Sequence, residues 1–484
     1  MKKICIMVEG SYPYVQGGVS SWVNALITQL PEFEFVIQTI AATRKEKGKF
    51  RYTLPENITA VHESFLQDDD LVTRAKIKKT LTKREKQALK SLVFGADEEW
   101  EVLFEAFTQT NLSLNALLMG MDFYDVVEEF YNERYDRVVF TDFLWTCRSM
   151  FLPLFTLMKW MPPEADVYHS MSTGYSGIIA SCASHLYQSP LLLTEHGIYT
   201  REREEEIIRS AWTQGIYKDL WINHFYMLSR CTYTRASRVF SLFDRARELQ
   251  VEYGCPEGKT EVVHNGVKYD QFQNLERKSP DDKYVNIGAV LRVTPIKDVK
   301  TMISAFHFAK EKMENLRLYI IGNTDEDQDY YEECVEMIAT LGTRDIIFTG
   351  HVNVRDYLGK MDIVLLTSIS EGQPLSVLEA MAARIPCITT NVGDCFDMLS
   401  AGDFENRAGI VAPVMNIGKL AGAILTLAED EALRQRLGEN GRSIVDRYYR
   451  DTVFIDRYRK AYEHYGAPGV GLSEGGEPHG GHRV

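Results

Sequence analysis

The sequence predicts an α/β fold of two Rossmann-like, doubly wound domains, with a helical insertion in the N-terminal one. Short apolar runs that suit buried parallel strands recur in both halves of the chain, and helical stretches separate them. Between about residues 62 and 163 this alternation gives way to helical periodicity, which indicates the insertion. A length of 484 residues suits about three domains or two large ones.

We expect the N-terminal domain to cover residues 1–270. It opens with an apolar strand at Lys3–Val8, a glycine-containing loop and a helix. A strand at Phe35–Ile40 completes the first βαβ unit. Beyond the insertion, strands followed by helical stretches return at Asp166–His169, Leu191–Thr194 and Arg238–Leu242.

The C-terminal domain, expected at residues 283–450, shows the repeated βαβ pattern more clearly. One of its helices is predicted at Leu375–Ala383. The polar segment Tyr269–Asp282 is predicted to link the domains. Residues 451–465 are predicted to form a terminal helix, with a return to the N-terminal domain as one option. The Gly-rich tail, 466–484, is predicted to be disordered. The strands are expected at Tyr284–Val290, Leu316–Ile321, Ile346–Thr349, Ile363–Thr367 and Cys387–Thr390.

The composition is that of a soluble globular protein. The formal charge of −14 argues against broad nucleic-acid binding, although it leaves room for a local anion site. The eight cysteines are scattered without a CxxC pair, which predicts reduced thiols rather than disulfides or zinc. Neither a signal-peptide core nor an apolar run of the ~18 residues that span a membrane is found, so we expect a cytoplasmic protein.

Two carboxylates lie eight positions apart in the segment EGQPLSVLE, from Glu371 to Glu379. Pro374 suits the start of a helix, whose free backbone N–H groups would favour an anion. Glu379, one turn further, could accept hydrogen bonds from paired hydroxyls such as a ribose diol. Glu371 could reach a second set of hydroxyls. A capped surface helix with incidental acids fits the spacing equally well.

Two cations, Arg292 and Lys297, follow the predicted strand Tyr284–Val290. A planar guanidinium and a compact ammonium at a strand's carboxyl end can form a phosphate clamp. Taken alone, solvated surface charges are an equal alternative.

Weaker signals lie elsewhere. The pair Gly17-Gly18 after the first strand would allow a ligand to approach the backbone closely. His196 ends a strand and could contact a sugar or phosphate, although a lone histidine is more often packed. Asn265 lies in an H-N-G-V turn near the expected hinge. The segment Asp68–Asp70 could mimic a metal-binding DxD motif, but it follows no apolar strand and is the least favoured of these sites.

Taken in order, these motifs resemble the retaining GT-B glycosyltransferases of family four, over almost the whole chain. The most specific elements are E-x7-E and the R…K pair. The segments GSYPYVQGGVSSW and EHGIYTRER most resemble members that build the Pel exopolysaccharide. The resemblance implies a UDP-sugar donor (UDP-glucose first), a growing glycan acceptor, and recruitment to an inner-membrane polysaccharide synthase and export complex. It implies no metal or other cofactor.

The resemblance also implies roles for individual residues. Arg292 and Lys297 would neutralise the leaving diphosphate, Glu379 would hold the ribose, and Glu371 would contact the donor sugar. His196 would lie near the reacting face of the sugar. Further donor contacts are implied for Gly17, Gly18, Asn265, Gly350, His351, Gln373, Pro374 and Leu375. Leu291 occupies a position where the family often has glycine.

Three alternatives remain at this level. A nucleotide-sugar 2-epimerase shares the fold, and a non-catalytic nucleotide-sugar-binding regulator of a membrane synthase would need the same site. A phosphorylase would require a pyridoxal-phosphate lysine, for which there is no signal. Separately, the basic run Arg74–Lys90 is either a solvated helix face or a docking site for an anionic membrane or acidic partner.

Overall fold

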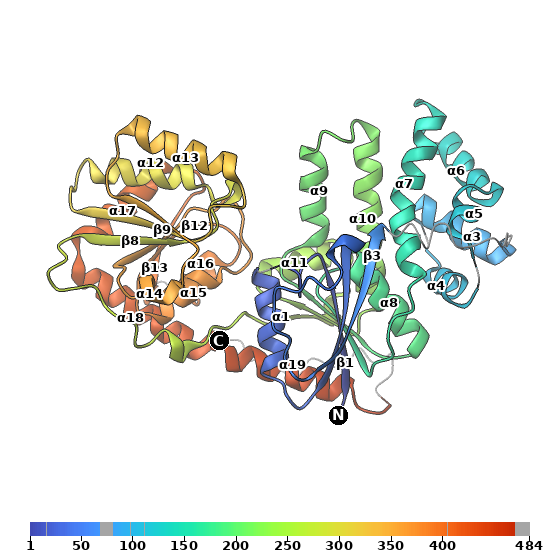
Figure 1. Cartoon of the computed structure of the whole chain (residues 1–484), viewed down its shortest axis with the longest axis horizontal. Helices are drawn as coiled ribbons and strands as arrows, with labels where there is room; N and C mark the ends of the chain where they lie inside the picture. Colours follow the sequence, from blue (N-terminus) through green and yellow to red (C-terminus); the bar gives the residue numbers. More distant parts are fainter. Residues whose placement is uncertain (16, 68–80, 97, 111, 404, 470–484) are drawn as a thin grey trace. The chain divides into compact units, whose positions relative to one another are not determined.

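The computed structural model describes residues 1–15, 17–67, 81–96, 98–110, 112–403 and 405–469 (Figure 1). Its contacts divide the chain into two compact units. Unit 1 comprises Met1–Val262 and Tyr458–Val484, and unit 2 comprises Val263–Arg457. Each unit contains a parallel sheet with helices packed against it, which confirms the predicted α/β fold of two Rossmann-like domains.

The sheet of unit 1 has the strand order β3-β2-β1-β4-β5-β6-β7, and every pairing is parallel. The order reverses between β1 and β4, which in such sheets places ligand sites at the strands' carboxyl ends. The side chains of Ile4–Val8 are fully buried, as expected of a strand covered on both faces. The strands are β1 (Lys3–Glu9), β2 (Glu34–Thr43), β3 (Ile58–Gln67), β4 (Val167–Ser170), β5 (Leu191–Glu195), β6 (Arg238–Ser241) and β7 (Thr260–Val262).

The helices of unit 1 lie between its strands. α1 begins directly after the first loop, and α9 and α10 form the long hairpin that stands out in Figure 1. They are α1 (Gly18–Thr28), α8 (Tyr175–Tyr187), α9 (Tyr199–Arg209), α10 (Ile216–Arg235) and α11 (Asp244–Glu252).

The helical insertion begins later than predicted. Residues 58–67 form β3, so the expected start at about His62 is wrong. This edge strand is only partly buried and reads ITAVHESFLQ, without the continuous apolar run that marks interior strands. The described helices of the insertion are α3 (Lys83–Phe94), α4 (Trp100–Gln109), α5 (Leu114–Leu118), α6 (Met121–Arg134) and α7 (Phe140–Met158).

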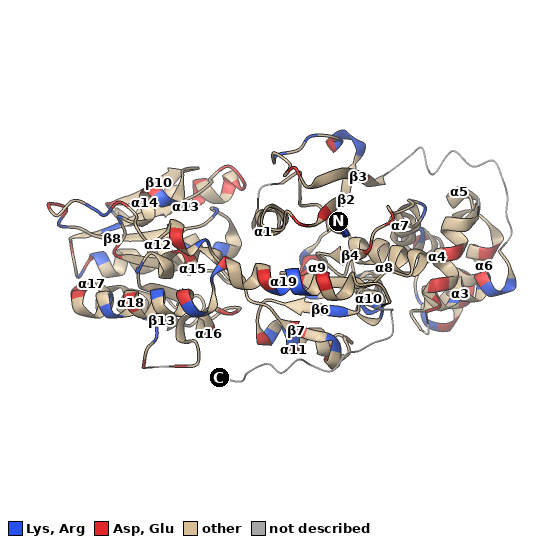
Figure 2. Ribbon diagram, turned by 90° about the horizontal axis from the view of Figure 1, so that it is seen from below, with Lys and Arg blue, Asp and Glu red and all other residues tan. Residues whose placement is uncertain are grey.

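The described part of the basic run lies on α3 and faces acids of α6 (Figure 2). Lys86 Nζ is 2.7 Å from Asp125 Oδ2, and Lys90 Nζ is 2.5 Å from Glu129 Oε1. These lysines therefore have partners within the insertion itself. The segment Asp68–Asp70 and the first half of the basic run lie outside the described residues, as does the tail from residue 470.

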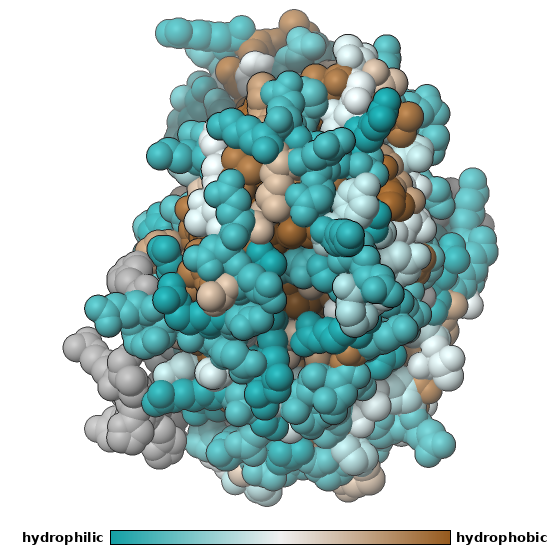
Figure 3. Space-filling model, turned by 90° about the vertical axis from the view of Figure 1, so that its left-hand side faces the viewer, coloured by the Kyte–Doolittle hydropathy of each residue, from teal (hydrophilic) through white to brown (hydrophobic). Residues whose placement is uncertain are grey.

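The sheet of unit 2 has the order β10-β9-β8-β11-β12-β13, again with parallel pairings. The polar segment Tyr269–Asp282, expected as a linker, lies inside this unit, where Lys278 Nζ contacts Asp362 Oδ2 at 2.5 Å. The face of unit 2 in Figure 3 is largely hydrophilic, with apolar residues in small separate groups. The strands are β8 (Val285–Val290), β9 (Leu316–Ile321), β10 (Ile346–Gly350), β11 (Ile363–Leu366), β12 (Cys387–Thr390) and β13 (Gly409–Ala412).

The helices of unit 2 alternate with these strands, and α15 follows β11 as the motif spacing predicts. They are α12 (Val299–Lys310), α13 (Gln328–Leu341), α14 (Val354–Leu358), α15 (Leu375–Ala382), α16 (Cys395–Ser400), α17 (Ile417–Glu429) and α18 (Glu431–Tyr448).

The last helix, α19 (Asp451–Tyr465), begins in unit 2 and ends in unit 1. In unit 1 the side chains of Tyr458 and Tyr462 are fully buried. The Tyr458 hydroxyl lies 3.0 Å from Thr194 Oγ1, and the Tyr462 hydroxyl lies 2.7 Å from His169 Nδ1. The end of the chain thus supplies part of the core of the first unit.

All eight cysteines are free and buried, in agreement with the prediction of reduced thiols. Among the described residues, every helix is too short or too polar to cross a membrane.

Candidate functional site

The predicted cations and carboxylates of unit 2 lie on loops that leave two neighbouring strands. β8 pairs with β11, so the loops that follow them start side by side at the sheet's carboxyl edge. Thr367 Oγ1 donates hydrogen bonds to the carbonyl oxygens of Lys297 and Asp298, at 3.0 and 3.1 Å. The Ile369 N–H donates to the Ile296 carbonyl at 2.9 Å. These bonds hold the two loops together, and with them the side chains that they carry.

Lys297 and Glu371 meet at this edge. Lys297 Nζ donates to Glu371 Oε1 at 2.5 Å, and Ser368 Oγ donates to the same oxygen at 2.6 Å. The side chains of Lys297 and Glu371 are only 18% and 11% exposed. An ammonium has three N–H donors, so one bond to Glu371 leaves further donors for an anion. The carboxylate is fixed in orientation by its two donors.

Arg292 lies on the same loop, but it pairs elsewhere. Its guanidinium donates from Nη1 to both carboxylate oxygens of Glu326, at 2.5 and 2.7 Å. Both side chains are well exposed, and exposed ion pairs contribute little stability. Arg292 can therefore exchange Glu326 for another anion at small cost. Sequence reasoning missed Glu326, because nothing in its polar loop marks it as the partner of this arginine.

Helix α15 begins between the two glutamates of the motif. Pro374 is its N-cap, and the backbone N–H groups of Leu375 and Ser376 have no hydrogen-bond partner among the described residues. Such a helix start attracts negative charge. Glu379, one turn along, is partly buried, and no described group donates a hydrogen bond to its carboxylate or forms an ion pair with it. Burial without a donor raises the pKa of Glu379 to about 7.

The side chain of Gln373 joins the EGQPL loop to two other segments. Its Oε1 accepts from the backbone N–H of Asn265 at 2.5 Å. Its Nε2 lies 2.5 Å from Asp394 Oδ2 and 3.2 Å from His264 Nδ1. The network is buried, which fixes the loop that carries Glu371. The sequence pointed to Asn265 and Gln373, but Asp394 and His264 were missed as members.

A glycine makes the close packing of that loop possible. Gly393 has φ +53°, and a Cβ there would lie 2.2 Å from the carbonyl oxygen of Gly372. The Asp394 N–H donates to that same carbonyl at 2.9 Å. A side chain at position 393 would push away the loop from which Glu371 projects. The Gly-Asp pair in the loop after β12 is the signal that could have revealed this contact.

Gly350 is the last residue of β10, at the far edge of the sheet, and His351 directly follows it. Gly350 has φ +67° and His351 is exposed; among the described contacts neither residue touches Lys297 or Glu371. Leu291 buries its side chain, and a Cβ at Gly322 would lie 1.9 Å from the Leu291 carbonyl oxygen. The loop with leucine in place of glycine is thus packed tightly against the loop after β9.

In unit 1, Gly17 is the N-cap of α1 and Gly18 its first residue, both exposed with open space around them. His196 directly follows β5, and its ring meets Trp22 of α1 edge-on, with centroids 4.7 Å apart. Its Nε2 is buried, and none of the residues that the structure describes forms a hydrogen bond with it. Burial lowers the pKa of His196 to about 4, so the imidazole is neutral at pH 7.

Sequence reasoning also missed Glu195, the residue before His196. Its side chain is 2% exposed, and its carboxylate accepts from Tyr233 Oη at 2.6 Å and Gln250 Nε2 at 3.0 Å. Burial raises the pKa of Glu195 to about 7 despite these donors. A glutamate that ends the apolar run LLLTE is the signal for it.

Two Rossmann-like units, with an anion-attracting helix start and buried charged groups at one sheet edge, define a protein of the GT-B class. Two family models match the chain: "Domain of unknown function (DUF3492)" over residues 2–258, and "Glycosyl transferases group 1" over residues 270–444. The first covers more than half of the chain, which therefore belongs to the DUF3492 family and carries a group 1 glycosyl transferase domain in its second half.

Similarity to individual proteins agrees with this assignment. The chain is 24% identical over 206 residues to the capsular polysaccharide biosynthesis glycosyltransferase CapM of Staphylococcus aureus, covering 41% of this chain and 52% of CapM. It is 48% identical over 241 residues to the putative teichuronic acid biosynthesis glycosyltransferase TuaC of Bacillus subtilis, covering 49% and 56%. The chain thus spans about half the length of these curated relatives.

A solved structure extends the similarity to both units. The crystal structure of Anabaena Alr3699/HepE in complex with UDP-glucose matches 96% of this chain and 100% of that chain, with a TM-score of 0.59 and 14% sequence identity. At this identity the match establishes the fold. The predicted GT-B fold is therefore confirmed.

Proposed function

We propose that the protein is a retaining, metal-independent hexosyltransferase that uses a UDP-sugar, with UDP-glucose as the first candidate, to build an extracellular polysaccharide. The observation that carries this proposal is the arrangement in unit 2. A buried Lys297–Glu371 pair, a helix start with free N–H groups and a carboxylate without donors all lie on the loops and helix that follow β8 and β11.

The leaving diphosphate would be stabilised by fixed positive charge. Lys297 retains free N–H donors beside Glu371, Arg292 is bound only to an exposed carboxylate, and the N-terminus of α15 offers two free N–H groups. Such donors, already in place before the reaction, are the main source of transition-state stabilisation where negative charge develops. They supply the charge that a metal would provide in other transferases, which is the basis for proposing a metal-independent reaction.

Glu379 is suited to hold a diol. Its carboxylate has four lone-pair sites and no donor, so two neighbouring hydroxyls of a ribose would satisfy it. Hydrogen bonds to the carboxylate favour its ionised form and would lower the raised pKa on binding. Glu371, fixed by Lys297 and Ser368, would orient hydroxyls of the donor sugar.

The retaining outcome is taken from the resemblance to family four, and a front-face reaction is consistent with it because no nucleophile is assigned among the described residues. A retaining reaction without a covalent intermediate can proceed on one face of the sugar, with the leaving phosphate accepting the proton of the acceptor hydroxyl. His196 is neutral and so would contact the sugar through a hydrogen bond rather than through a charge.

The donor and product are inferred from similar proteins. HepE binds UDP-glucose, and CapM acts in capsular polysaccharide biosynthesis. Within this group, the segments GSYPYVQGGVSSW and EHGIYTRER resemble PelF, which favours a polymer of the Pel type and an inner-membrane synthase and export complex as partner.

The test is incubation of the purified chain with UDP-glucose and, in parallel, UDP-N-acetylhexosamines, each with short oligosaccharide acceptors. We expect UDP release coupled to an acceptor one sugar longer, with the anomeric configuration of the donor preserved by NMR. Formation of an epimerised nucleotide sugar without transfer would support the 2-epimerase instead. Tight UDP-sugar binding with neither product would support a non-catalytic regulator.

A further inference from the structure

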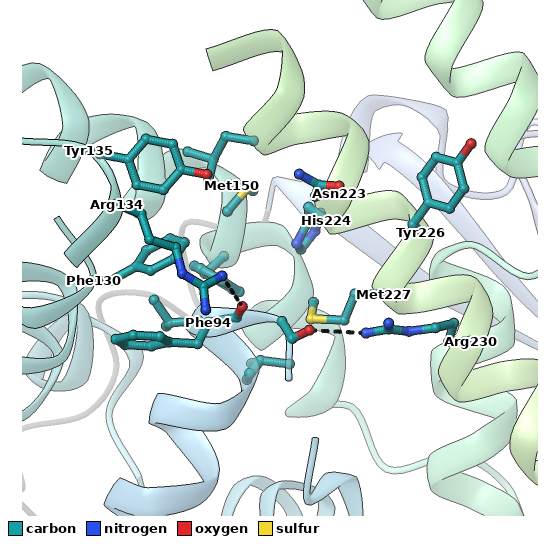
Figure 4. A pocket seen from close by; sticks show the side chains of 15 residues that line it. Phe94, Phe130, Arg134, Tyr135, Met150, Asn223, His224, Tyr226, Met227 and Arg230 are labelled. Carbon is teal, nitrogen blue, oxygen red and sulfur yellow. Dashed lines mark hydrogen bonds between the residues drawn. The ribbon is translucent and has the colours of Figure 1, made fainter. Parts of the chain in front are cut away.

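A cavity lies in unit 1 between the helical insertion and α10 (Figure 4). Its volume is about 240 Å³, and its walls come from α3, α6, α7 and α10. A cavity of ~150 Å³ is enough to hold benzene. This one therefore accommodates a six-membered ring that carries substituents.

His224 gives this cavity its chemistry. The residue is 3% exposed, and neither Nδ1 nor Nε2 has a hydrogen-bond partner among the described residues. Burial lowers the pKa of His224 to about 3, so its ring is neutral, with one N–H donor and one acceptor nitrogen. His169, an equally buried histidine of unit 1, bonds through both nitrogens, to Tyr462 at 2.7 Å and to Thr194 at 2.8 Å. A ligand in the cavity would supply the hydrogen-bond partners that His224 lacks.

Two arginines reach the cavity from opposite sides, and both already have charge partners. Arg230 pairs with Glu98 and donates to the Gly95 carbonyl at 3.2 Å. Arg134 lies 3.2 Å from Glu133, and its guanidinium stacks over the ring of Phe94 at 5.5 Å. Figure 4 shows both guanidinium groups directed at backbone oxygens. The cavity therefore presents donors without an unpaired positive charge, which favours a neutral ligand over an anion.

Apolar and aromatic side chains form part of the walls. Phe130, Met150 and Met227 are buried there, and Asn223 adds an amide beside His224. A purely apolar ring would leave the imidazole unpaired, at a cost typical of buried polar groups. A neutral ring with several hydroxyls satisfies the imidazole, the amide and the spare guanidinium donors together, because each hydroxyl both donates and accepts.

We propose that this cavity is a second carbohydrate site, which binds one neutral sugar unit between α3, α6, α7 and α10. The source of that unit, a glycan made by this protein, rests on the proposed function. The site itself rests on the cavity, the unpartnered His224 and the paired arginines. Its occupant would be part of an acceptor or product chain.

The experiment is saturation-transfer NMR on the full chain with glucose and N-acetylglucosamine at about 10 mM, tenfold above a Kd of about 1 mM. Benzoate and benzene serve as an anionic and an apolar ring of similar size. We expect transfer to at least one sugar and its loss in His224→Phe, with UDP affinity unchanged. Loss of sugar binding by at least tenfold in Arg134→Ala, an exposed position, provides a second readout if His224→Phe does not fold.

The matched control is His169→Phe, which removes a histidine that has both partners. It should lower the thermal midpoint and leave sugar binding unchanged, whereas His224→Phe should not lower the midpoint. Sugar binding that survives both His224→Phe and Arg134→Ala would overturn the proposal. So would binding of benzoate or benzene in place of the sugars, or the absence of sugar binding altogether.

Failure of this site and failure of the proposed function are distinguishable. A chain that transfers sugar from UDP-glucose but binds none in the cavity would retain the function and lose the second site. A chain that binds sugar through His224 but neither transfers nor hydrolyses a donor would retain the site and lose the function.

Discussion

Glu195 in unit 1 is buried and Glu379 in unit 2 is partly buried; both lie near the carboxyl edges of their sheets, and burial raises the pKa of each to about 7. Their surroundings differ. Glu195 accepts hydrogen bonds from Tyr233, Gln250 and Thr173, whereas Glu379 has no donor among the described residues. The pKa therefore does not separate a structural carboxylate from one that awaits a ligand. The presence or absence of hydrogen-bond donors to the carboxylate distinguishes the two.

The largest expected effect tests whether residues at the carboxyl edge of the sheet of unit 2 catalyse the transfer. Lys297→Ala should reduce kcat/KM for transfer by about 100-fold or more, because a preorganised charge at the leaving diphosphate is lost. Lys300→Ala is the matched control: Lys300 lies three residues away, exposed and paired with Glu333 at 2.6 Å. It should retain normal turnover. Steady-state kinetics with the best donor measure both, and near-normal turnover in Lys297→Ala would refute the assignment.

The next prediction separates the roles of the two glutamates, one in UDP binding and the other in turnover. Glu379→Ala should weaken UDP binding by about 10- to 100-fold, since hydrogen bonds to a charged group contribute about 1.5–3 kcal/mol. Glu371→Ala should bind UDP almost normally and show a lower kcat, because orientation of the sugar tolerates only small displacements. Calorimetry with UDP and steady-state kinetics separate the two. Loss of UDP binding in Glu371→Ala, with retention in Glu379→Ala, would mean that the roles are reversed.

Replacing Glu195 and replacing Glu379 should have opposite effects on the stability of the fold. Glu195→Leu leaves the donors of Tyr233 and Gln250 buried without an acceptor, at a cost of about 1–3 kcal/mol. Glu379→Leu leaves no donor unpaired. It should therefore raise the thermal midpoint at pH 8, by an amount equivalent to at most about 3 kcal/mol.

The pH dependence of the stability gained in Glu379→Leu follows from the direction of the pKa shift of Glu379. The pKa of Glu379 is raised from 4.5 to about 7 in the folded chain, so its contribution to stability is fully present below about pH 4.5 and is lost as the pH rises to about 7. The advantage of Glu379→Leu should thus be large at pH 8 and small at pH 5. Calorimetric scans at both values test this, and an equal gain at both would contradict the raised pKa.

The smallest expected effect is that of chelation, which should leave the transfer activity unchanged. Transfer should continue in EDTA, because Lys297, Arg292 and the start of α15 are proposed to supply the positive charge. Activity that disappears on chelation and returns with manganese would instead favour a metal site, with Asp68–Asp70 as the first residues to examine.

The strands in the sheet interiors were predictable because they are continuous apolar runs; Leu316–Ile321 and Cys387–Thr390 were predicted to the residue. β3 was missed because it is a partly polar edge strand. The edge strands β7 and β13, which are also only partly buried, were missed as well. The same limit applies to the site. Spacing identified Lys297 and Glu371, but Glu326 and Asp394 reach their partners from distant loops, which only the folded chain brings together.

The position of α19 has a consequence for how the chain is made. Unit 2 is continuous in sequence, whereas unit 1 needs Tyr458 and Tyr462 to complete hydrogen bonds to Thr194 and His169, which precede them by more than 250 residues. During synthesis the later unit can close its core while the earlier one still lacks its last helix. The core of unit 1 is therefore completed only after all of unit 2 has been synthesised.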